Sequence, residues 1–280
     1  MASLPSLTLI GPGRAGRAFA RSWLASGGAL EAVLGRSRDS ALAAAREIGS
    51  GRPGVLGADR FGSEVALIAV PDDRLSEAAR EAASSGSCGL AYHLSGALPA
   101  GILAPLSEAG ASVGSFHPLR AFTGASEETL RGAFVAIEGE EAACRSAMGF
   151  ADALGARGHR IAPGSKPLYH AGATLAAGGV VSVVGLAARA WSLAGIPEQV
   201  ARPALSGLAS RAAAGAETQP FAQALTGPIA RRDLSTVRAH CAALAGHPEL
   251  IALYRALAEE TIARTPGLGR EEELRAILAC

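Results

Sequence analysis

Lys166 and His170 are the residues best suited by type and spacing to proton transfer. Lys166 is the only lysine among the 26 Lys and Arg residues of the chain. A guanidinium keeps its proton at any accessible pH, whereas burial can tune an ammonium into an acid or a base. We predict that Lys166 is a catalytic acid, because an ammonium beside a carbonyl stabilises negative charge and supplies a proton. His170, one helical turn later, would orient Lys166 or a substrate, or would cap or pack the helix.

A glycine-rich segment follows the apolar run Leu7–Ile10 and precedes helix-forming sequence. It fits the pattern Gly-x-Gly-x-x-Gly, in which glycines permit a tight turn and a close approach of the backbone to a pyrophosphate. The following helix start attracts that anion. The segment predicts a dinucleotide site, with a ligand-free glycine turn as the alternative. Its expected cofactor-binding residues are Gly11, Pro12, Gly13, Arg14, Ala15 and Gly16.

The residues after the second apolar run, Leu30–Leu34, indicate which dinucleotide binds. An acidic residue at this position typically holds the ribose hydroxyls of NAD. This chain instead has Arg36, Ser37 and Arg38, two guanidiniums and a hydroxyl that suit a 2′-phosphate. We therefore predict NADP as the cofactor. The alternative is that the two arginines are solvated and Asp39 caps the next helix.

Three later loops also follow apolar runs, and ligands of open parallel sheets bind beyond the carboxyl ends of strands. Val70 and Pro71 would lie beneath the cofactor ribose. Ser95 would lie near the nicotinamide, and with the Gly96 amide it could bind a substrate carboxylate. His117 is a candidate proton donor or substrate ligand, with a buried structural imidazole as the alternative.

A parallel sheet is required to position these loops. Apolar runs alternate with Ala-rich amphipathic segments such as Ala15–Ala25, Ser40–Ile48 and Leu75–Ala83, as in βαβ units. The expected strands are Leu7–Ile10, Leu30–Leu34, Val55–Leu56, Val65–Val70, Leu90–Leu94, Ser112–Phe116, Phe134–Ile137 and Arg157–Ile161.

From Lys166 onward only helical segments occur, separated by Gly-Pro and Pro-Gly breakers. The predicted fold class is α/β, with an N-terminal Rossmann-type, mostly parallel sheet followed by an all-α C-terminal domain. We expect domains at 1–162 and 163–280, with the ligand site in the cleft between them.

Composition excludes several classes of protein. The 280 residues have a net charge of +1, which argues against nucleic-acid binding. The cysteines are widely spaced and no histidine cluster occurs, so we predict no metal site. The N-terminus has no signal-peptide pattern, and we expect a cytoplasmic protein. Residues 171–188 carry no charge, but their small side chains favour a buried helix over a membrane span.

The motifs, in their order along the chain, resemble those of bacterial two-domain proteins that join a Rossmann-like domain to a catalogued domain of unknown function. A later segment, Leu225–Asp233, is similar to the C-terminal signature of that family. The other matching segments are Gly11–Gly16, Ala69–Asp72, His93–Gly96, Ser115–Leu119 and Lys166–His170.

The architecture more distantly resembles that of 6-phosphogluconate, 3-hydroxyisobutyrate, ketopantoate and pyrroline-5-carboxylate reductases and dehydrogenases. Many of those proteins carry a catalytic Lys followed four residues later by Asn, where this chain has Lys166 and His170. The resemblance implies a proton-donor role for Lys166, a homodimer formed through the helical domain, and ketopantoate as a first substrate to test. Thr226 and Arg231 lie near a helix start, where they would bind a substrate carboxylate, with a solvated surface as the alternative.

These observations together predict an NADP-dependent oxidoreductase that reduces a small carboxylate-bearing carbonyl compound in the interdomain cleft. The alternative is a non-catalytic NADP-binding sensor or scaffold. A third interpretation keeps the fold with an empty glycine loop.

Overall fold

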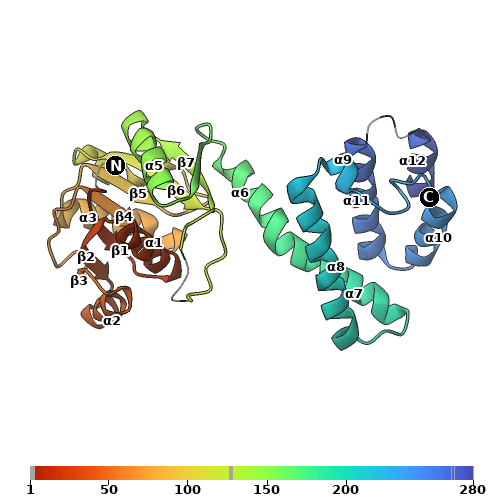
Figure 1. Ribbon diagram of the computed structural model, residues 1–280, viewed down its shortest axis with the longest axis horizontal. Coiled ribbons are helices and arrows are strands. Elements are labelled where there is room, and N and C mark those ends of the chain that lie inside the picture. Colours follow the sequence, from red (N-terminus) through yellow and green to blue (C-terminus); the bar gives the residue numbers. More distant parts are fainter. Residues whose placement is uncertain (1–3, 126–128, 266, 268, 280) are drawn as a thin grey trace. The chain divides into compact units, whose positions relative to one another are not determined.

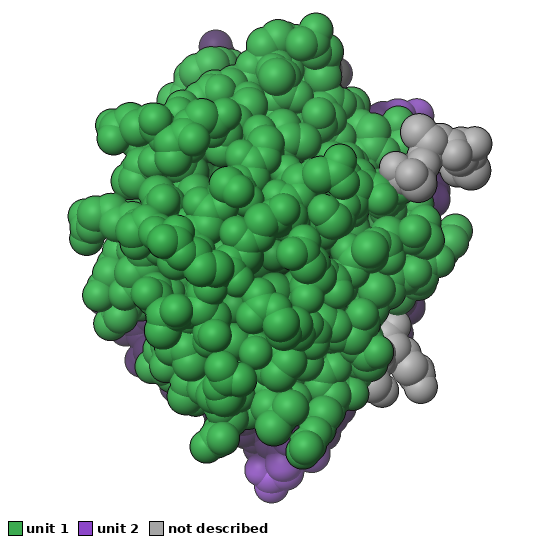
Figure 2. Space-filling view, turned by 90° about the vertical axis from the view of Figure 1, so that its left-hand side faces the viewer, with its two compact units in different colours: residues 1–173 green, residues 174–280 purple. Residues whose placement is uncertain are grey.

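The computed structural model describes residues 4–125, 129–265, 267 and 269–279. The chain divides into two compact units, Met1–Ala173 and Thr174–Cys280, which are coloured separately in Figure 2. Packing thus assigns residues 166–173 to unit 1. The expected domain boundary after residue 162 stays a prediction.

Unit 1 is built on one eight-stranded sheet of order β3-β2-β1-β4-β5-β6-β7-β8 (Figure 1). All neighbouring strands are parallel except β6 and β7, which are antiparallel. The expected mostly parallel sheet is therefore confirmed, and each predicted strand overlaps an observed one, although Val55–Leu56 shares only Val55 with β3. The strands are β1(Ser6–Ile10), β2(Ala29–Gly35), β3(Arg52–Val55), β4(Val65–Ile68), β5(Leu90–His93), β6(Ser112–Pro118), β7(Phe134–Gly139) and β8(Arg157–Arg160).

Helices cover both faces of this sheet, so its central strands read as continuous apolar runs. One core includes Leu7, Leu9 and Phe116 with residues of α1(Arg14–Ala25), α2(Arg38–Ile48) and α5(Glu141–Ala153). The other includes Ile10 and Ile68 with residues of α3(Leu75–Ser85), η2(Ala100–Leu103) and α4(Ala104–Glu108). The remaining pieces are the short turn η1(Asp72–Arg74) and the helix α6(Lys166–Thr174).

The described part of unit 2 is helical, as the breaker pattern predicted. Its core joins the last three helices, whereas α7 and α8 share a smaller cluster around Ala188, Ala201 and Leu205. The elements are η3(Leu175–Gly179), a π-helical turn, and then α7(Val180–Leu193), α8(Glu198–Thr218), α9(Phe221–Ala224), α10(Leu234–Leu244), α11(Pro248–Arg264) and α12(Glu271–Ala279).

The expectation of a buried helix over residues 171–188 is wrong for the single chain. Val181 is 72% exposed, and Ala188 is the one fully buried residue of α7. The reason is that few helices of unit 2 pack against α7, chiefly α8, so one face stays uncovered. By length and composition alone, the continuous helix Lys166–Leu193 is also long and apolar enough to cross a membrane.

Candidate functional site

The glycine loop connects β1 to α1 beside β4, at the point where the strand order reverses. Gly11 has φ of +81°, and a Cβ there would lie 2.5 Å from Val70 Cγ1. A Cβ on Gly16 would lie 2.9 Å from Ala69 Cβ, because α1 packs closely onto β4. Both glycines are thus required by close packing, as the dinucleotide fingerprint demands.

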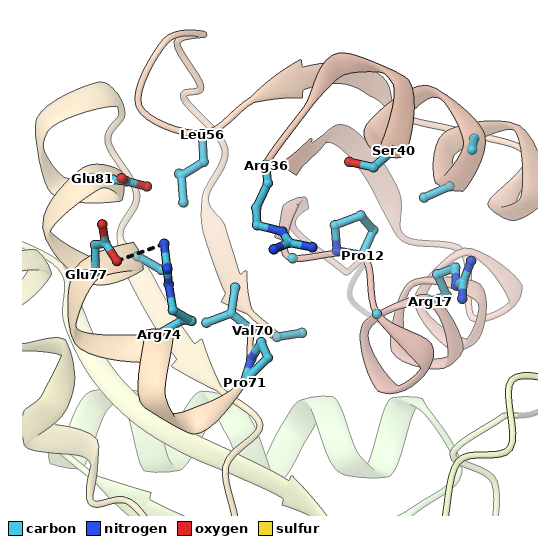
Figure 3. Close-up of a pocket in the computed structure, with 16 residues that line it drawn as sticks. Pro12, Arg17, Arg36, Ser40, Leu56, Val70, Pro71, Arg74, Glu77 and Glu81 are labelled. Carbon is cyan, nitrogen blue, oxygen red and sulfur yellow. Dashed lines mark ion pairs between the residues drawn. The ribbon is translucent and has the colours of Figure 1, made fainter.

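A cavity of about 530 Å³ opens above this loop (Figure 3). The Arg36 side chain extends from the end of β2 toward the middle of the cavity. Six of the predicted cofactor residues line its wall: Gly11, Pro12, Gly13, Arg36, Val70 and Pro71.

The other predicted cofactor residues lie elsewhere. Arg14, Ala15 and Gly16 form the first turn of α1. Ser37 caps α2 by accepting a bond of 3.3 Å from Ser40 N, so the cap is Ser37 and not Asp39. Arg38 pairs with Asp59 at 3.3 Å instead of lining the cavity.

Four charged cavity residues were missed from the sequence, and one of them is Arg17 on α1. Arg74, Glu77 and Glu81 line the wall opposite Arg36, and Arg74 pairs with Glu77 at 2.9 Å. Their spacing of three and four residues places them on one face of a helix, and that helix begins beyond the carboxyl end of β4. This spacing was the available signal.

Lys166 lies at a second site, where three elements of unit 1 meet. Its side chain is fully buried at the start of α6. The ammonium donates hydrogen bonds to the Ser95 carbonyl oxygen, just after β5, and to Ser115 Oγ in β6. Within the described residues it forms no ion pair with a carboxylate. The predicted acid is therefore held by neutral acceptors.

Burial controls the charge on this lysine. Loss of water lowers the pKa of Lys166 from its ordinary 10.5 to about 8, and the negative charges of Glu138 and Asp72 partly oppose the fall. An ammonium with a pKa near 8 can both give up and regain a proton near neutral pH. This is the behaviour expected of a proton donor.

Three rings lie against the lysine site. His117 Nδ1 is 2.8 Å from Tyr169 Oη, and the rings of His117 and His170 meet edge-on with centroids 6.3 Å apart. A Cβ on Gly96 would lie 2.6 Å from His170 Cδ2, so only glycine fits there without displacing a ring. The predicted residues Ser95, Gly96, His117, Lys166 and His170 are thus brought together.

Tyr169 was missed from the sequence, although its position three residues after Lys166 on the same helix was a usable signal. Burial raises the pKa of the Tyr169 hydroxyl. Burial and the neighbouring charges of Lys166 and His170 lower the pKa of His117 to about 4. His117 is therefore neutral at pH 7, and its hydrogen bond with Tyr169 joins two uncharged groups.

Thr226 and Arg231, the remaining predicted substrate residues, lie in unit 2. With Arg232 they line a cavity of about 510 Å³ in that unit. Asp233 caps α10 by accepting a bond of 3.1 Å from Thr236 N. Among the residues that the structure describes, no cluster of three His, Cys, Asp or Glu residues could hold a metal ion.

Two domain models match the chain in sequence. Residues 3–118 match the Rossmann-like domain, and residues 133–261 match the domain of unknown function DUF2520. The chain therefore belongs to the proteins that join a Rossmann-like domain to a DUF2520 domain, as its order of motifs predicted. No curated protein matches it.

Solved structures of similar fold cover nearly the whole chain. A protein from Thermotoga maritima is 22% identical, with a TM-score of 0.79 over 92% of this chain and 98% of that one. Pyrroline carboxylate reductase from Plasmodium falciparum, solved with NADP bound, is 11% identical, with a TM-score of 0.58 over 95% and 100%. A reductive aminase from Aspergillus terreus, solved with NADPH and ethyl levulinate, is 17% identical, with a TM-score of 0.57 over 98% and 92%. At these identities the likeness establishes the shared fold.

Proposed function

We propose that this protein is an NADP-dependent reductase of a small carbonyl compound that carries a carboxylate. The observation that carries the proposal is the burial of Lys166 and the lowered pKa that results from it. The only lysine of the chain is buried between the loop after β5 and Ser115 in the middle of β6, with its pKa lowered to about 8. The same unit holds a cavity with the dinucleotide glycine loop. A proton donor and a dinucleotide site are the two parts that carbonyl reduction requires.

The cavity residues fit a phosphorylated dinucleotide. Gly11 and Gly13 leave the backbone open to a pyrophosphate, and the start of α1 attracts its charge. Arg36 extends into the cavity at the position where NAD-binding proteins carry a carboxylate, so we assign the 2′-phosphate of NADP to it. NADPH would supply the hydride. The Rossmann-type structures solved with NADP or NADPH support this choice.

In the proposed reaction the carbonyl carbon receives the hydride, and Lys166 gives its proton to the carbonyl oxygen, which becomes a hydroxyl. Because α6 and the loop after β5 cover the ammonium, substrate binding has to displace part of this cover. The Gly96 amide would then face the substrate carboxylate, and Thr226 and Arg231 are further proposed ligands of that group. Ketopantoate is the first substrate to test.

The key experiment compares Lys166→Met with wild type in a screen of 2-oxo acids with NADPH. Loss of the acid should lower kcat at least about 100-fold. NADPH binding should stay within about threefold, because Lys166 lies outside the cavity. Wild-type turnover in the variant would remove Lys166 from the mechanism.

The cofactor has its own test in a matched pair of variants. Arg36→Ala should weaken NADPH binding about tenfold and leave NADH binding unchanged, since a charge-assisted hydrogen bond to the 2′-phosphate is lost. Arg38→Ala is the control, because Arg38 pairs with Asp59 outside the cavity. Equal losses for both nucleotides would argue against NADP specificity.

A non-catalytic NADP sensor is the second candidate, and the complete burial of Lys166 favours it. It predicts tight NADPH binding without oxidation of NADPH by any acid of the panel. We further propose that the protein is a cytoplasmic homodimer, with the uncovered face of α7 and α8 covered by a second copy rather than by lipid.

A further inference from the structure

The buried imidazole of His93 contacts both ends of the loop whose Ser95 carbonyl accepts a hydrogen bond from Lys166. His93 is the last residue of β5 and is fully buried. Ser95 N donates a hydrogen bond of 3.1 Å to His93 Nδ1. On the other side of the ring, His93 Nε2 lies 3.3 Å from the Pro99 carbonyl oxygen. One side chain therefore bridges the loop from Ser95 to Pro99.

These two contacts define one form of the ring. A backbone N–H can only donate, so His93 Nδ1 must be unprotonated, and the hydrogen on Nε2 then points to the Pro99 carbonyl. Burial, with the charge of Lys166, lowers the pKa of His93 to about 3. The ring is thus a neutral Nε2–H tautomer whose two nitrogens are both used.

Two further side chains, one in the loop and one on β7, accept hydrogen bonds from the loop backbone. Ser95 Oγ accepts hydrogen bonds from Ala97 N at 3.2 Å and Leu98 N at 3.0 Å. Glu138 Oε2 accepts a bond of 2.9 Å from Ala100 N. The Ser95 carbonyl therefore projects from a rigid turn, and it accepts a hydrogen bond from the Lys166 ammonium.

We propose that His93 is a positioning residue, which fixes the Ser95 carbonyl at the Lys166 ammonium and thereby controls how readily that ammonium releases its proton. A buried ammonium has lost its hydrogen bonds to water, so the stability of its charged form depends on the protein acceptors that remain. Among the described residues, Lys166 has two such acceptors, the Ser95 carbonyl and Ser115 Oγ. Losing the carbonyl should favour the neutral amine.

Other ionisable groups near Lys166 are the same in every variant compared. They are Glu138 on β7, Asp72 before α3, His117 on β6 and His170 on α6. A role for His93 in catalysis rests on the proposed function. The effect of His93 on the pKa of Lys166 does not rest on it and can be measured without a substrate.

The test uses two amide variants that differ in which ring nitrogen they replace. In His93→Asn the amide oxygen takes the place of Nδ1 and keeps the bond from Ser95 N. In His93→Gln the amide group takes the place of Nε2 and keeps only the bond to Pro99. We expect His93→Gln to lower the pKa of Lys166 by about one unit, as for a lost hydrogen bond to a charged group. His93→Asn should leave it at the wild-type value.

A single lysine makes the measurement direct. Protein labelled with ¹³C-lysine gives one ε-carbon signal, whose shift against pH reports the ionisation of Lys166 alone. A merely structural role for His93 would give the two amides equal effects or none, and either result overturns the proposal. Should His93→Gln not fold, ¹⁵N spectra of the wild-type ring decide, because an Nδ1–H tautomer contradicts the bridge and an Nε2–H tautomer supports it.

Kinetics separates this inference from the proposed function. If substrates are turned over, the pH profile of kcat should move with the Lys166 pKa in His93→Gln and stay unchanged in His93→Asn. A pKa that responds to His93 in a protein without turnover supports the positioning role and rejects only the reductase. If the protein turns over substrate and the pKa of Lys166 is unchanged in both His93 variants, the positioning role alone is rejected.

Discussion

The two compact units differ in how completely they bury their own apolar side chains. In unit 1, Trp23, Tyr92 and Phe116 are all at most 2% exposed. In unit 2, Leu175 and Val181 are each 72% exposed and Leu208 is 58% exposed. An eight-stranded sheet covered on both faces completes its core within one chain, whereas the α7–α8 pair has one face without a partner. Unit 1 thus buries most of its large apolar side chains, with Leu168 as an exception at 80% exposed, whereas α7 and α8 of unit 2 leave several of theirs exposed.

The groove between α7 and α8 sharpens this difference. It has a volume of about 700 Å³ and includes Val180, Val181 and Val184 in its wall. Exposed apolar surface of this kind marks association sites in soluble proteins. The contrast between the units leads to three predictions of decreasing effect.

The largest effect is expected from truncating the two tryptophans of the chain, one in each unit. The Trp23 ring is fully buried against Phe19 and Phe150, and its Nε1 donates to the Pro5 carbonyl. Trp23→Ala should cost about 4 kcal/mol of unfolding free energy, as large cavities in cores do. Trp191→Ala is the matched control and should cost less than half as much, since Trp191 is only half-buried. If urea unfolding shows equal losses of unfolding free energy for the two variants, the proposed difference in burial between the two units is wrong.

A smaller effect concerns the buried ammonium of Lys166 in unit 1. The pKa of Lys166 is about 8 in the folded protein and 10.5 when unperturbed. Between these values the unfolded chain holds the extra proton, so stability rises with pH. Wild type should gain up to about 3 kcal/mol from pH 7 to pH 10.5 relative to Lys166→Met. Urea midpoints of both proteins across this range measure the gain, and parallel curves would contradict it.

The third effect is on association. Val181→Glu places a charge on the uncovered face of α7 and should weaken the proposed homodimer about 100-fold, or nearly 3 kcal/mol. Leu257→Glu, on an exposed position of α11, should leave association unchanged. Sedimentation against concentration distinguishes the 28.1 kDa chain from its dimer. If the wild-type protein stays monomeric at high concentration, the proposal that a second copy covers this face of α7 is rejected.

Much of this architecture could be predicted because it follows local patterns. Apolar runs between helical segments located the inner strands of the sheet, and the glycine loop was identified by its flanking elements. The edge strands β3 and β8 are not apolar runs, and the prediction for β3 shares only Val55 with the observed strand. The antiparallel direction of β7 could not be predicted, because alternation of apolar residues is the same in either direction. The exposure of α7 was also missed, since small apolar residues suit burial inside one chain or against another.

The sites were predictable to a different extent. Lys166 was identified by composition, as the only lysine of an arginine-rich chain. Arg36 and Arg38 were equivalent in the sequence, and only the fold turns one into the cavity and the other toward Asp59. Glu138 contacts Ala100 from 38 residues away, so no local pattern could have revealed that contact. His93 directly precedes the loop that it contacts, but the sequence alone does not show that its ring turns back onto Ser95 and Pro99.

The two edges of the large sheet bear on how this protein avoids aggregation. The edge strand β3 contains Pro53, which lacks an amide hydrogen, and the opposite edge β8 carries Arg157 and Arg160. Proline and charged side chains at an edge oppose the addition of a further strand. Growth of the sheet into a continuous ladder between molecules is therefore blocked at both ends, and fibrous assembly through unit 1 is disfavoured even at high concentration.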